Sequence, residues 1–70
     1  MTNRWKRTRQ VLKVCPYYTM WTANEYVNMD TGERLYKVYG SRWVDGEMTQ
    51  VFVAEFKDFL DVMSYVDQRL

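Results

Sequence analysis

Histidine is absent from this 70-residue chain, and cysteine occurs once, at Cys15. A single cysteine excludes an intrachain disulfide, and without histidine it lacks the usual fellow ligand of a zinc site. The missing imidazole also removes the side chain most often used as a general acid or base. We therefore expect a protein that is not an enzyme and that holds neither a metal ion nor another cofactor.

Long apolar runs are absent as well. No segment approaches the roughly 18 to 20 apolar residues that span a bilayer, and the N-terminus lacks the apolar stretch of a secretory signal. We expect no membrane contact and a cytoplasmic location. The single cysteine agrees with a reducing compartment, where thiols are kept reduced.

Glycine is scarce, and two of the three glycines lie in recognisable turns. The segments Asp30-Thr31-Gly32 and Asp45-Gly46 are typical of hairpin loops and separate three runs rich in aromatic and β-branched residues. These runs predict strands over residues 17–28, 33–44 and 47–54. We expect residues 1–70 to form one small α+β domain, a three-stranded or four-stranded antiparallel β-meander covered on one face by a C-terminal α-helix.

The N-terminal segment leaves two interpretations open. Residues 9–15 fit a strand or a helix, with a preference for the strand, and residues 1–8 are expected to be a frayed basic arm. Pro16 ends the element in either case, because the residue before a proline avoids helical geometry.

The first hairpin predicts a register with Met29 opposite Glu33, which sets Tyr26 against Tyr36. The second turn sets Trp43 against Met48, Tyr39 against Phe52 and Val38 against Val53. Alternation along the strands then gathers most large apolar side chains on one face: Trp21, Ala23, Val27, Leu35, Tyr39, Trp43, Met48, Phe52 and Ala54. The opposite face is expected to hold a candidate partner-binding cluster, namely Tyr26, Arg34, Tyr36 and Arg42.

The cover for the apolar face is predicted over residues 58–69. Asp58 is a suitable N-cap, with Asp61 in the first turn, and Phe56 is placed to pack against Val62. Apolar residues recur at helical spacing and form the stripe that should face the sheet: Phe59, Val62, Met63, Val66 and Leu70.

Charge is unevenly distributed although the net charge is only +1. Residues 1–24 carry five basic residues and no acid, whereas residues 25–70 carry five basic and nine acidic residues. The basic set is a candidate for contact with phosphate or with an acidic partner: Arg4, Lys6, Arg7, Arg9 and Lys13. The alternative is that this segment folds back onto the acidic helix of its own chain.

Two functions from different classes fit these features. We favour a small regulator or inhibitor that binds a protein partner through exposed aromatic and charged residues, as accessory proteins of bacteria and bacteriophages often do. The alternative is a nucleic-acid-binding module in which the basic segment contacts phosphate and the Tyr/Arg face contacts bases. A homodimer formed through a free strand edge is also expected to be possible, because the core is small.

The order of three strands followed by a helix resembles that of double-stranded-RNA-binding domains and of the DNA-binding domains of some integrases. The resemblance covers most of the chain but concerns element order alone, and a shared topology does not imply a shared function. Where the RNA-binding domains begin their last helix with a lysine cluster, this chain has Glu55 and Asp58.

Overall fold

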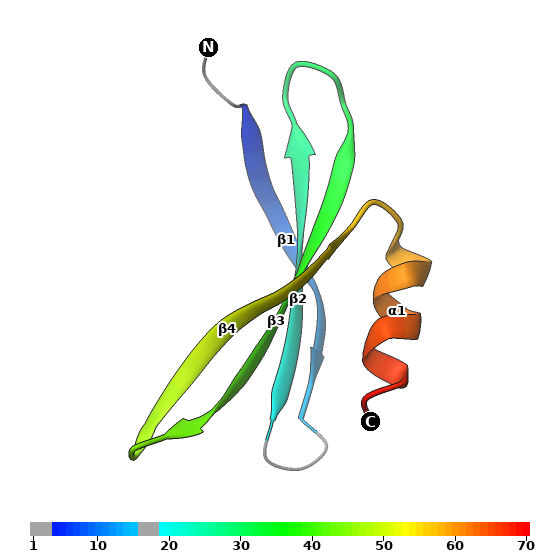
Figure 1. Ribbon diagram of the computed structural model, residues 1–70. Coiled ribbons are helices and arrows are strands. Elements are labelled where there is room, and N and C mark those ends of the chain that lie inside the picture. Colours follow the sequence, from blue (N-terminus) through cyan, green and yellow to red (C-terminus); the bar gives the residue numbers. More distant parts are fainter. Residues whose placement is uncertain (1–3, 16–18) are drawn as a thin grey trace.

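The computed structural model describes residues 4–15 and 19–70, which form a four-stranded antiparallel sheet and one helix (Figure 1). The strands lie in chain order across the sheet and are followed by the helix: β1 (Trp5–Val14), β2 (Met20–Asn28), β3 (Arg34–Val44), β4 (Glu47–Phe56) and α1 (Phe59–Asp67). The expected α+β meander is confirmed, and the sheet has four strands.

The N-terminal segment is a strand that begins at Trp5, so residues 5–8 belong to the sheet rather than to a frayed arm. β1 pairs with β2 in a register that shifts twice, once between Arg7 and Arg9 and once between Gln10 and Leu12. Such bulges bend a strand and increase its twist, and the strands in Figure 1 fan apart strongly. Residues 1–3 and 16–18, which include Pro16 and the first residues of the strand expected over 17–28, lie outside the described residues.

The loop between β2 and β3 corrects the expected register by one residue. The Asn28 amide donates to the Glu33 carbonyl at 2.8 Å, and Gly32 adopts a positive φ of 77°. The Asn28 side-chain oxygen accepts hydrogen bonds from the backbone N–H groups of Asp30 and Thr31. Because Asn28 itself closes the loop, it stands opposite Glu33, and Met29 becomes a loop residue.

A shift of one residue changes which side chains share a face, since successive side chains alternate. Tyr26 lies opposite Leu35 rather than Tyr36, and Ala23 lies opposite Val38. Ala23, Tyr36 and Val38 are buried with Val62 and Val66 of α1, so these five residues form the core. Tyr36 therefore packs beneath the helix, which is the opposite of the expected placement.

The second hairpin follows the expectation at its turn. Asp45 and Gly46 have positive φ values of 51° and 81°, Trp43 pairs with Met48, and Tyr39 pairs with Phe52. Further along, Val38 pairs with Ala54 rather than with Val53, because β4 has a bulge at that point. The type I′ turn thus fixes the register near the loop, and the bulge shifts it at the far end.

Helix α1 begins as expected at Asp58, whose side chain accepts a hydrogen bond from the Leu60 amide at 3.0 Å. Val62 and Val66 of the expected stripe are buried and Phe59 is partly buried, whereas Met63 and Leu70 are exposed. Tyr65 packs in their place, with its ring against Phe56 and edge-on to Trp21. The helix therefore covers the part of the sheet face around Ala23 and Val38.

Candidate functional site

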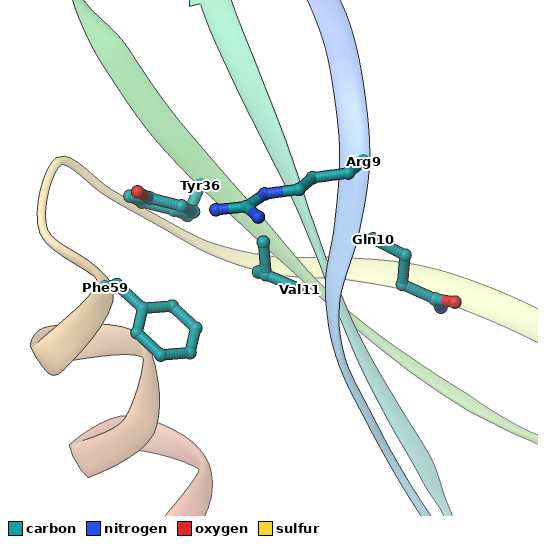
Figure 2. Close-up of a pocket in the computed structure, with 5 residues that line it drawn as sticks. All are labelled: Arg9, Gln10, Val11, Tyr36 and Phe59. Atoms are coloured by element: carbon teal, nitrogen blue, oxygen red, sulfur yellow. The ribbon is translucent and has the colours of Figure 1, made fainter.

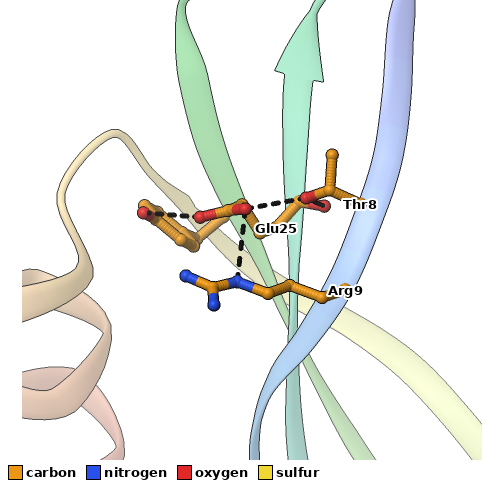
Figure 3. Close-up of polar contacts among 4 residues, drawn as sticks. Thr8, Arg9 and Glu25 are labelled. Atoms are coloured by element: carbon orange, nitrogen blue, oxygen red, sulfur yellow. Dashed lines mark hydrogen bonds and ion pairs between the residues drawn. The ribbon is translucent and has the colours of Figure 1, made fainter.

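A buried carboxylate occupies the sheet face beneath the helix. The side chain of Glu25 in β2 accepts hydrogen bonds from the hydroxyl of Thr8 in β1 at 2.7 Å and from that of Tyr36 in β3 at 3.2 Å. Arg9 Nε lies 3.4 Å from the same carboxylate (Figure 3). Glu25 is 5 % exposed, so three strands are joined by one largely desolvated acid.

The hydrogen bonds of this cluster determine its protonation. The hydrogen bond from Thr8 is the main reason that the pKa of Glu25 is lowered, and it outweighs the effect of burial; Tyr36 and Arg9 lower the pKa further. Burial, and then the bond to Glu25, raise the pKa of Tyr36. An ionised Glu25 held by donors is a weak base, so the cluster is suited to holding β1 against β2 and β3.

A cleft of about 350 Å³ lies beside this cluster, lined by Arg9, Gln10, Val11, Tyr36 and Phe59. Figure 2 shows Arg9 and Val11 pointing toward α1, whereas Gln10 points away from it. Arg9 Nε and the Tyr36 hydroxyl are already engaged with Glu25. Among the residues that the structure describes, no group of three or more His, Cys, Asp or Glu side chains could hold a metal ion.

The structure does not bring the expected partner-binding cluster together. Tyr26 lies on the face away from the helix, whereas Tyr36 is buried on the helix side. Arg34 and Arg42 are exposed, but the strand alternation places them on the helix side with Tyr36. Arg42 lies there beside Trp21 and Val51.

The five basic residues of the N-terminal segment are also divided. Arg7 and Lys13 pair with Tyr26 and Thr22, which places them on the face away from the helix. Lys6 and Arg9 lie on the helix side, and Arg4 is 3.4 Å from Asp30 beside the loop. Within residues 4–15 and 19–70, the ion pairs are those of Arg4 and Arg9, so this segment does not fold back onto the acidic helix.

The face away from the helix, called the uncovered face below, carries a row of aromatic side chains from three strands. Tyr39 packs edge-on against Phe52, with 5.8 Å between the ring centroids, and Lys37 Nζ lies 4.8 Å from the centre of the Tyr26 ring. Burial, and then a hydrogen bond to Tyr26, raise the pKa of Tyr39. Trp43, on the same face, is 65 % exposed and Phe52 is 52 % exposed.

Polar side chains form the centre of the uncovered face. Thr22, Asn24 and Ser41 are buried, and the Gln50 side-chain amide donates to the Thr22 hydroxyl at 3.4 Å. Asn24 Oδ1 is buried and accepts no hydrogen bond from the described residues. A polar centre of this kind is unlike the apolar face that would pack into a second core layer.

Trp5 extends the uncovered face at the N-terminal end of β1. It lines a second cleft, of about 230 Å³, together with Tyr26, Leu35, Lys37 and Glu55. The sequence did not indicate this use of Trp5, because residues 1–8 were expected to be frayed. Tyr39, Phe52 and Trp43 were missed because the expected register assigned them to the covered face, and the signal that corrects it is Asn28 ahead of the Asp-Thr-Gly turn.

No protein-family model matches the sequence, and the searches of curated proteins and of solved structures found no significant similarity. No helix within the described residues has the length and apolar character needed to cross a membrane. Similarity to known proteins therefore gives no indication of function, and function is inferred from the structure itself.

The buried Glu25 predicts an acid-dependent part of the stability. Because the pKa of folded Glu25 lies below its ordinary value of 4.5, the charged form stabilises the fold above about pH 4.5, and this contribution is lost as the pH falls through the folded pKa. Glu25→Gln should lower the free energy of unfolding by about 2 kcal/mol at pH 7, with the difference from the parent shrinking toward pH 3. Urea unfolding of the parent and the variant between pH 7 and pH 3 measures this difference in the free energy of unfolding.

The control for this prediction is Glu33→Gln, which changes the same functional group at an exposed loop position. It should leave both the stability and its pH dependence within about 0.5 kcal/mol of the parent. A Glu25→Gln variant as stable as the parent at pH 7, or a difference that grows as the pH falls, contradicts the assigned role of this carboxylate.

Proposed function

We propose that this protein is a small non-enzymatic regulator or inhibitor that binds a protein partner through the uncovered face. The observation that carries the proposal is the aromatic row formed by Tyr26, Tyr39, Phe52 and Trp43, over which no described element packs. Trp43 and Phe52 are exposed, and Tyr26 and Tyr39 are partly exposed. Several large aromatic side chains on one face are more typical of an interaction surface than of ordinary surface.

The chemistry of the face indicates what kind of surface would fit it. Trp43 and Phe52 are the most exposed aromatic anchors and lie toward the β3–β4 turn. Arg7 and Lys13 of β1 and Lys37 of β3 add positive charge to the same face. A partner surface with an apolar pocket flanked by acidic side chains would complement both features, because interfaces combine aromatic anchors with complementary charge at the rim.

Single-stranded nucleic acid is the second candidate, because bases stack on aromatic side chains while cations contact phosphate. Trp5, Tyr26 and Tyr39 lie near Arg7 and Lys37 on the uncovered face. Against this candidate, Glu55 lines the cleft beside Trp5, and the net charge of the chain is only +1. We therefore favour the protein partner.

Truncation of the exposed anchors tests the protein partner. The tagged protein is used to capture the partner, which is then purified for titration by calorimetry. Trp43→Ala and Phe52→Ala should each weaken binding at least about tenfold, because interface anchors contribute 1.4 kcal/mol or more. Leu60→Ala is the matched control, since Leu60 is a large apolar residue even more exposed than the two anchors but lies on α1, and it should change affinity less than about twofold.

Equal binding of the partner to all folded variants contradicts the use of the uncovered face. Circular dichroism and a thermal melt establish that each variant is folded before it is titrated. A variant that loses the partner through unfolding is replaced by Trp43→Leu or Phe52→Leu, which keep an apolar side chain while removing the ring.

Oligonucleotide binding separates the second candidate from the first. If nucleic acid is the ligand, a labelled single strand of about 15 nucleotides should bind several-fold more weakly with each doubling of salt, and Arg7→Ala should reduce that slope by about one unit. Lys57→Ala, which removes an exposed cation outside the sheet, is the control and should leave the slope unchanged. Absence of binding at low salt rules out nucleic acid and leaves the protein partner.

A further inference from the structure

The two edges of the sheet differ in how open they are to another strand. β1 carries Lys6, Arg7, Arg9 and Lys13 and has two register shifts, which are the features that block strand addition in natural sheets. β4 has ten residues without lysine, arginine or proline, and its pairing with β3 is regular from Glu47 to Phe52. The β4 edge is thus an unprotected template for strand pairing.

The tight turn determines which backbone groups of β4 point away from the sheet. In a two-residue hairpin the residues that flank the turn, here Val44 and Glu47, exchange both backbone hydrogen bonds, and such pairs alternate along the ladder. Thr49 and Val51 therefore direct their N–H and C=O groups toward β3. Met48, Gln50 and Phe52 direct theirs outward, where an added strand would pair.

We propose that β4 pairs antiparallel with β4 of a second copy of this chain, in a register centred on Gln50. Gln50 then faces Gln50 of the second copy, and each Met48 faces Phe52 across the axis. The one charged residue in the regular segment, Glu47, faces the uncharged Val53. A register displaced by two residues toward the helix would carry the pairing across the bulge at Val53, and a bulge disrupts the ladder.

A second copy fits this edge because the regular segment of β4 is self-complementary: the exposed Met48 and Phe52 are equally spaced on either side of Gln50. Met48 and Phe52 lie on the uncovered face, and Val51 lies on the helix side. The two-fold pairing lays each exposed Met48 against an exposed Phe52, and it supplements a small core, in which five hydrophobic residues are buried within the described part of the chain. The pairing also places the uncovered faces of the two copies on the same side of one eight-stranded sheet. Dimerisation through β4 is independent of which ligand the uncovered faces bind.

Sedimentation equilibrium over a range of concentrations tests the proposal with a matched pair of lysine variants. The parent should dimerise with a dissociation constant in about the micromolar range, because short edge pairings bury little surface. Gln50→Lys places two like charges at the axis and should weaken the dimer at least about tenfold. Gln10→Lys makes the same change at an exposed position of the β1 edge and should leave the dimer within about twofold of the parent.

Amide exchange of the parent chain tests the pairing without any substitution. The N–H groups of Met48, Gln50 and Phe52 should exchange more slowly as the concentration rises through the dissociation constant, whereas those of the β1 edge should not change. A chain that is monomeric throughout, a dimer that Gln50→Lys and Gln10→Lys affect equally, or a dimer without slowed exchange at these three positions overturns the proposal. If Gln50→Lys does not fold, Gln50→Glu supplies the same like-charge test.

Discussion

Asn28 closes the loop between the two central strands with its own side chain, and this closure sets the register on which the faces of the sheet depend. The Asn28 oxygen holds the amides of Asp30 and Thr31, so Asn28 stands opposite Glu33. The same register carries Tyr36 beneath the helix and leaves Tyr39 on the other side. Both the core and the uncovered face follow from this pairing, because a slip of one residue would exchange the two sets of side chains.

Glu25 explains how such a small core holds its outermost N-terminal strand. The apolar side chains of β1 are only partly buried, and the strand is attached by its ladder and by the hydrogen bond from Thr8 to the buried carboxylate. Glu25 also binds Tyr36, whose ring packs against Phe59 of the helix, with 5.9 Å between the centroids. A single ionised side chain thus connects β1, β3 and indirectly α1. The cost of burying the acid is offset by donors from two neighbouring strands and by Arg9.

The order of β2, β3, β4 and α1, the places of the two turns and the Asp58 cap could be predicted from the sequence because each depends on local chemistry. The first element fits either a strand or a helix on the sequence alone. The faces could not, because the Asp-Thr-Gly turn suggested a loop that begins one residue too late, and alternation carried that error across β2 and β3. Glu25 interrupted the apolar pattern of β2, and nothing in the sequence indicated that Thr8 and Tyr36 would donate hydrogen bonds to its carboxylate. The expected register also placed Tyr26 on the face opposite to Tyr39 and Phe52, so the sequence did not predict that these three side chains lie together.

The register of β2 against β3 is the central claim, since the core and the proposed binding face both depend on it. Proton–proton contacts measured by NMR test it directly. The Tyr36 ring should show contacts with Phe59, and the Tyr39 ring should show contacts with Tyr26 and Phe52. Cross-strand contacts between Tyr26 and Tyr36, together with a Tyr36 ring that shows no contact with the helix, would contradict the account.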